Sequence, residues 1–139
     1  MTRALCAATL AIAPLALSAT PAHAVVSCTV NGRFVSGTTV NGTAGPDLIR
    51  CGALAAGDRV DGLGGSDYIV IIGTVAGTVA GSTGSDYITA DAGVAPTGQV
   101  LGGPDNDFIR VGPNAGLVDG GTGVDFCRVA SGNPPVNCP

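Results

Sequence analysis

Apolar residues recur along residues 40–128 at two intervals, one constant and one variable. Five times a valine is followed nine residues later by a second apolar residue. The return from that residue to the next valine takes 11, 10, 12 and 9 residues. β-Branched residues at every half-turn, separated by glycine-rich turns, favour two short strands per repeat. The pairs are Val40 and Ile49, Val60 and Ile69, Val79 and Ile88, Val100 and Ile109, and Val118 and Cys127.

This pattern predicts an all-β parallel β-solenoid of about five rungs, with two short strands per rung and disulfide-capped ends. Glycine or proline interrupts every window long enough for a helix. One edge has turns of constant length, which indicates a backbone requirement or a ligand. The loops of the opposite edge vary in length, and we expect them to be surface loops with nothing to hold in register.

Every constant-length turn ends in an aspartate that lies two residues before the second apolar position. Stacked rungs would place these five carboxylates in one row, where like charges repel. A divalent cation between the rungs would remove that cost, because Ca²⁺ binds oxygen ligands. For any single copy, an aspartate that caps its own turn without metal is the alternative interpretation.

Residues 120–128 read Gly-Gly-Thr-Gly-Val-Asp-Phe-Cys-Arg, which matches the pattern G-G-x-G-x-D-x-U-x if cysteine counts as apolar. The chain thereby resembles the hemolysin-type calcium-binding (RTX) nonapeptide family over residues 40–128. The copies that begin at Gly42, Gly62 and Gly81 lack the second glycine, and Asp105 replaces the fourth-position glycine of another copy.

The resemblance implies a right-handed parallel β-roll whose turns hold Ca²⁺ as the cofactor. The side-chain ligands that it implies are Asp47, Asp67, Asp86, Asp107 and Asp125, and the backbone ligands are the carbonyls of Gly42, Gly62, Gly81, Gly102 and Gly120.

In the family both edges of the roll usually carry the motif, and this chain departs from that arrangement. The residue two positions before a valine on the second edge is Asp58, Gly77, Gly98 or Gly116, of which only Asp58 offers a carboxylate. We therefore predict one calcium edge with three or four sites.

Residues 1–24 resemble a secretory signal peptide. Arg3 precedes an apolar run, and Ala22-His23-Ala24 forms a small-x-small cleavage site. We expect a secreted, extracellular protein; lipidation of Cys28 is the alternative and would leave a membrane anchor. The expected organisation is a signal peptide over 1–24, an N-terminal cap over 25–39, an RTX-like β-roll over 40–128 and a C-terminal cap over 129–139.

The charge balance narrows the classes of partner. The chain has ten acidic residues, six basic residues and a net charge of −4. This balance disfavours nucleic acid and anionic membranes as partners, and we expect no membrane span. The only histidine belongs to the signal peptide, so we expect no enzyme. A hydrolase that uses Asp105 and Asp107 is a remote alternative.

Four cysteines follow the signal peptide, and four allow three connectivities. Cys28 and Cys51 lie about one rung apart, and Cys127 and Cys138 lie together at the other end. We predict disulfides within these two pairs, each stapling a terminal rung. Zinc binding is the alternative, but there is no C-x-x-C pair.

Tyr68, Tyr87, Phe108 and Phe126 stand in register with Leu48. We expect a ladder that packs on itself, with a sugar-binding or surface-binding row as the alternative. Calcium is therefore the expected partner, and a cell-surface or glycan partner remains open. The alternative function is a metal-independent, disulfide-stapled structural or adhesive solenoid at the cell surface.

Overall fold

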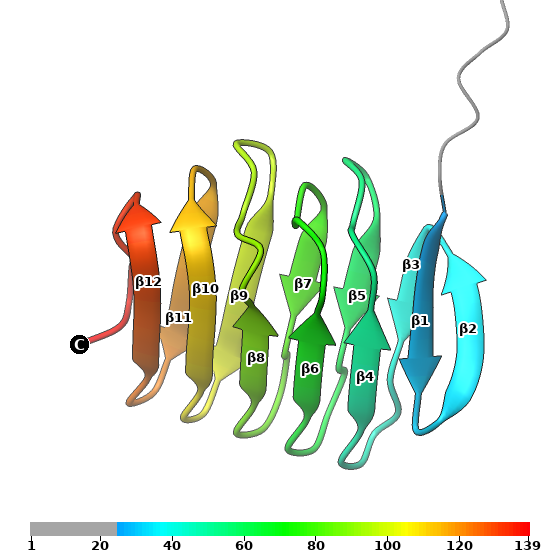
Figure 1. Ribbon diagram of the computed structural model, residues 1–139. Coiled ribbons are helices and arrows are strands. Elements are labelled where there is room, and N and C mark those ends of the chain that lie inside the picture. Colours follow the sequence, from blue (N-terminus) through cyan, green and yellow to red (C-terminus); the bar gives the residue numbers. More distant parts are fainter. Residues whose placement is uncertain (1–24) are drawn as a thin grey trace, which may run out of the picture.

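The computed structural model describes residues 25–139, which form twelve strands and no helix. The predicted signal peptide, residues 1–24, lies outside the described residues. A seven-stranded front sheet runs in the order β12-β10-β8-β6-β4-β1-β2, and a five-stranded back sheet in the order β11-β9-β7-β5-β3 (Figure 1). The strands are β1 (Val26–Val30), β2 (Arg33–Gly37), β3 (Thr39–Asn41), β4 (Leu48–Cys51), β5 (Arg59–Asp61), β6 (Tyr68–Ile71), β7 (Thr78–Ala80), β8 (Tyr87–Ala90), β9 (Gln99–Pro104), β10 (Phe108–Asn114), β11 (Leu117–Thr122) and β12 (Phe126–Gly132).

The five repeats stack as five rungs, which confirms the predicted parallel β-solenoid. Each rung has one back-sheet strand and one front-sheet strand, and neighbouring rungs pair in parallel. The back-sheet valines are Cα partners from Val40 to Val118, and the front-sheet row runs from Ile49 to Cys127. All of these valines and isoleucines are fully buried. Two stacked rows, mostly of β-branched side chains, therefore form the centre of the core, and Cys51, Ile71, Ala90 and Val111 of the front sheet are buried beside them.

The variable-length loops contribute a third buried row, so the expectation that they hold nothing in register was wrong. Leu54, Val75 and Val94 face one another through isolated parallel bridges, and each is at most 2% exposed. Asn114 continues the row, and its side chain bonds the backbone of Asn133 and Gly116. Loop length can vary because only one residue of each loop has to reach the core.

The N-terminal end is closed by the β1–β2 hairpin, and β1 pairs antiparallel with β4. The hairpin turn consists of Asn31 and Gly32, which both have positive φ (51° and 79°). Asn-Gly is the sequence that such two-residue turns prefer. Cys28 and Cys51 are Cα partners in the β1–β4 pairing and form the predicted disulfide.

The C-terminal residues fold back along β11. Val136 bridges Asp119, and the Gly120 N–H donates to the carbonyl of Val136. The predicted disulfide between Cys127 and Cys138 ties this segment to β12. Both ends of the solenoid are thus stapled near a terminal rung. Within residues 25–139, no helix has the length and apolar character that crossing a bilayer requires.

Candidate metal-binding edge

The constant-length turns lie along one edge of the solenoid, the lower edge in Figure 1. Each turn leads from a back-sheet strand into a front-sheet strand and ends in one of the five predicted ligand aspartates. The structure brings all five onto this edge and buries them to 3–4% exposure. A buried carboxylate needs partners, because its desolvation is costly.

One carboxylate oxygen of each later aspartate is bound by the backbone of the preceding rung. The N–H of Asp47 donates to Oδ1 of Asp67 at 2.8 Å. The same 2.8 Å bond joins Asp67 to Asp86, Asp86 to Asp107, and Asp107 to Asp125. We call this row of five residues the aspartate ladder. It holds neighbouring turns in register, a structural role that the repeat spacing did not predict.

The other carboxylate oxygen has no hydrogen-bond partner. Oδ2 is buried and unbonded in Asp67, Asp86, Asp107 and Asp125. At each opening glycine, the Oδ2 of the same turn and one carbonyl oxygen of the next turn both lie within 2.8 Å of the position that a Cβ would occupy. Carboxylate and carbonyl oxygens are both acceptors, so a proton or a cation would be needed to join them. The approaching carbonyls belong to Gly62, Gly81, Gly102, Gly120 and Asn137.

The opening glycines are required for space, because a Cβ there would collide with these oxygens. Left-handed backbone occurs at later turn positions instead. The second residue of the repeat has a left-handed backbone in four copies: Leu63 (φ 73°), Ser82 (φ 75°), Gly103 and Gly121. Asp105, at the fourth position, is also left-handed (φ 81°). Three of the four repeats that lack a motif glycine therefore place a side chain in a conformation that favours glycine, whereas Thr43 in the first repeat does not have a positive φ.

Asp47 begins the ladder and has both oxygens occupied. Asn31 Nδ2 donates to Oδ1, and the backbone N–H of Thr43 donates to Oδ2. Burial alone would raise the pKa of Asp47, but the bonds from Thr43 and Asn31 bring it below its ordinary value. The repeat pattern did not predict the role of Asn31, because this residue lies outside the repeat. Its position in an Asn-Gly hairpin turn was the available signal.

The inner aspartates have the opposite electrostatic environment. Burial, together with the charges of Asp86, Asp47 and Asp61, raises the pKa of Asp67 to about 6. Burial, together with Asp86, Asp125 and Asp105, raises the pKa of Asp107 to about 7. Burial and the charge of Asp105 also raise the pKa of Asp86. Burial in the ladder thus disfavours the ionised form of these inner carboxylates in the absence of a cation.

The oxygen atoms of this edge are of the type that binds calcium, but the acidic side chains do not form a cluster around one point. No group of three metal-binding side chains occurs within residues 25–139. The four turns that end in Asp67, Asp86, Asp107 and Asp125 instead each offer one orphaned carboxylate oxygen beside a backbone carbonyl, and Ca²⁺ accepts both kinds of ligand. On the opposite edge, Asp58 is buried and its Oδ2 accepts the Ala55 N–H, while the equivalent positions of later rungs are glycines.

The aromatic row lies on the outward face of the front sheet. Rings of Tyr68, Tyr87, Phe108 and Phe126 stack with centroid separations of 4.9, 4.6 and 5.1 Å. Interplanar angles of 4°, 1° and 18° show that the inner ring faces cover one another. The expected ladder that packs on itself is confirmed.

Comparison of the chain with protein-family models, curated proteins and solved structures finds no match. The resemblance to the RTX family rests on this chain's own residues.

Proposed function

We propose that this chain is a secreted, non-catalytic calcium-binding module in which Ca²⁺ bridges successive Gly/Asp turns on one edge of the solenoid. The observation that supports this most is the row of buried, unbonded Oδ2 atoms in Asp67, Asp86, Asp107 and Asp125. Each lies beside the same opening glycine as a carbonyl oxygen of the next turn, or of the C-terminal segment at the last rung. The four orphaned oxygens agree with the predicted three or four sites.

In this proposal the chain's own residues fix the ligands in advance. Oδ1 of each ladder aspartate from Asp67 onward is held by a backbone N–H, which orients Oδ2 toward the opening glycine. The missing Cβ of that glycine leaves room for the two oxygens to converge. A divalent cation would supply the positive charge that the ladder lacks and couple its binding to folding. The two disulfides favour an oxidising compartment, in line with secretion.

A metal-independent, disulfide-stapled structural solenoid is the second candidate. The elevated pKa values of Asp67 and Asp107 favour it, because a protonated Oδ2 can donate to the facing carbonyl. In this candidate a proton takes the place of the cation, and the solenoid shape itself is what the protein provides.

Thermal melts followed by circular dichroism separate the two candidates. The disulfide-intact chain is melted at slightly alkaline pH in millimolar Ca²⁺, in millimolar Mg²⁺ and in chelator. Linkage gives about 2.7 kcal/mol for each site held at one hundred times its Kd, so calcium should raise the Tm markedly. Mg²⁺ should have a smaller effect, because it demands a more rigid octahedral site. An unchanged Tm in calcium would favour the metal-independent solenoid.

A further inference from the structure

Two arginines stand side by side on the outward face of the front sheet, away from the aspartate ladder. Arg110 and Arg128 are Cα partners in the parallel pairing of β10 with β12, and both are exposed. Like charges directly opposite one another on neighbouring strands are destabilising. The pair is conspicuous in a chain with a net charge of −4.

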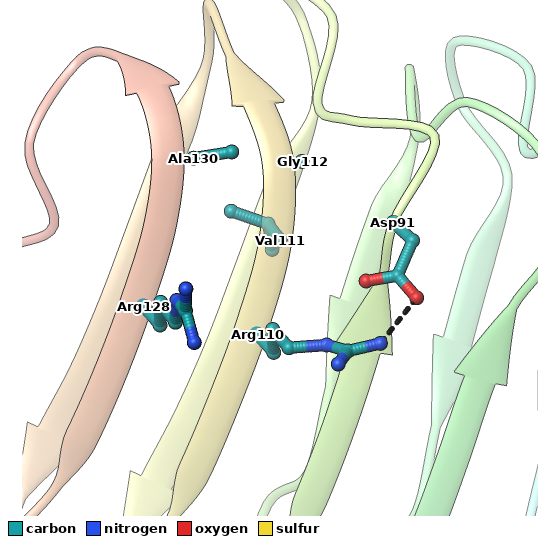
Figure 2. A pocket seen from close by; sticks show the side chains of 6 residues that line it. All are labelled: Asp91, Arg110, Val111, Gly112, Arg128 and Ala130. Atoms are coloured by element: carbon teal, nitrogen blue, oxygen red, sulfur yellow. Dashed lines mark hydrogen bonds and ion pairs between the residues drawn. The ribbon is translucent and has the colours of Figure 1, made fainter.

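Only one of the two arginines has a carboxylate partner among the described residues. Arg110 pairs with Asp91 at 2.5 Å. Figure 2 shows the Arg110 side chain reaching sideways to Asp91, while Arg128 stands alone on the adjacent strand. Gly112 places Asp91 here, because its missing Cβ lets the Asp91 carbonyl approach the β10 backbone.

A shallow hollow opens beside these side chains, lined by Asp91, Arg110, Val111, Gly112, Arg128 and Ala130 (Figure 2). Beyond the arginines, the next outward positions of β10 and β12 are glycine and alanine, so no long side chain fills the space. Both side chains of the ion pair are exposed, Arg110 to 46% and Asp91 to 63%. An exposed pair contributes little to stability, so Arg110 is available to another anion.

We propose that the hollow between Arg110, Arg128 and Asp91 binds the carboxylate group of a small acidic ligand, such as an acidic sugar. Guanidinium groups bind carboxylates through paired, charge-assisted hydrogen bonds. Two arginines and one aspartate leave a single net positive charge, which matches a singly charged group better than a phosphate dianion. The bound anion would also relieve the repulsion between the two guanidiniums.

The test is a titration of the disulfide-intact chain with glucuronate, followed by NMR shifts of the backbone amides and the arginine side chains. Glucose is the neutral control, and calcium and ionic strength are held constant. We expect saturable shifts at Gly112, Ala130 and the Arg128 guanidinium with glucuronate and none with glucose. Loss of one charge-assisted contact in Arg128→Gln should weaken binding about tenfold.

Arg50 provides the matched control. It occupies the same outward row on β4, but its parallel Cα partner is Val70 rather than a second arginine. Arg50→Gln should leave glucuronate binding unchanged, and Asp91→Asn should tighten it severalfold by removing the competing carboxylate. Three results would each overturn the proposal. Glucose could cause the same NMR shifts as glucuronate, or Arg128→Gln and Arg50→Gln could weaken glucuronate binding equally. The third is binding of glucose 6-sulfate without binding of glucuronate.

Discussion

The backbone N–H of Asp86 donates a 2.8 Å hydrogen bond to Oδ1 of Asp107, one rung further along the solenoid. The equivalent bond explains why an aspartate recurs in each turn after the first: it satisfies a backbone donor of the preceding rung. It also leaves Oδ2 as the carboxylate oxygen of Asp107 that has no hydrogen-bond partner. The ladder therefore combines a structural bond with a buried charge that needs neutralising.

Replacing Asp107 by asparagine separates these two roles. The amide oxygen can still accept the Asp86 N–H, and the amide nitrogen can donate to the facing Gly120 carbonyl. In chelator we expect Asp107→Asn to stabilise the fold by about 1–2 kcal/mol, since a buried uncompensated charge disappears. Adding calcium should raise the stability of Asp107→Asn by less than it raises the stability of the parent chain. Melts of both proteins in both conditions measure this difference.

Asp107→Ala is the companion variant, because it deletes the acceptor as well as the charge. The buried Asp86 N–H loses its partner, which costs about 1–3 kcal/mol with or without calcium. If asparagine destabilises the calcium-free chain as much as alanine does, Oδ2 is not a source of unfavourable charge.

Adding a methyl group to an opening glycine should disrupt the edge. In Gly102→Ala the new Cβ would meet Asp107 Oδ2 and the Gly120 carbonyl, so we expect a loss of about 1–3 kcal/mol. Gly45→Ala is the matched control: it lies in the first of these turns, and its Cβ would meet nothing within 4 Å. Urea unfolding compares the two, and similar losses in both would show that the convergence of oxygens is not the constraint.

Leu63 offers the reverse substitution. Its φ of 73° lies in the left-handed region, and its side chain is 44% exposed. Leu63→Gly should stabilise the chain by up to about 1 kcal/mol, because relief of strain exceeds the added entropy of the unfolded state. Its N–H bond to Asp61 remains. A clear decrease of the urea midpoint in Leu63→Gly would contradict this expectation.

The raised pKa values of Asp67 and Asp107 give the calcium-free chain an unusual pH dependence. The ordinary aspartate pKa is 3.8, whereas these groups titrate at about 6 and about 7 in the folded chain. At a pH between 3.8 and these raised pKa values, the folded state holds protons that the unfolded state has released. Stability should therefore fall as the pH rises from about 4 to about 7 and level off above that. The lowered pKa values of Asp47 and Asp61 work in the opposite sense at more acid pH.

Calcium should reverse the trend, because it binds the ionised carboxylates and its effect grows as they lose protons. Melts of metal-stripped protein across this range, with and without added calcium, test both halves. A calcium-free chain that gains stability from about pH 4 to 7 would contradict the assigned shifts.

The repeat spacing was sufficient to predict two rows of the core, and the positions of the four cysteines predicted both disulfides. Val40 and Ile49 are representative, because a constant nine-residue interval fixes which side chains stack. The row of Leu54, Val75 and Val94 escaped prediction because its offset from the preceding isoleucine is not constant (five, six and six residues) and its members lie among other small apolar residues. Asn31 escaped because a cap lies outside the repeat.

The aspartates of the candidate site were identifiable from the sequence, but the roles of their oxygen atoms were not. Which oxygen of Asp107 accepts the Asp86 N–H depends on register and side-chain rotamer together. The same applies to Gly102: the resemblance implied its carbonyl as a ligand, and the structure adds that its missing Cβ leaves space for Asp107 Oδ2 and the Gly120 carbonyl.

Isothermal titration of Ca²⁺ into the metal-stripped, disulfide-intact chain at slightly alkaline pH tests the central claim most directly. The account predicts saturable binding of three or four ions per chain, with binding weakened in Asp107→Asn. A titration into millimolar Ca²⁺ that yields only the heat of dilution would contradict it.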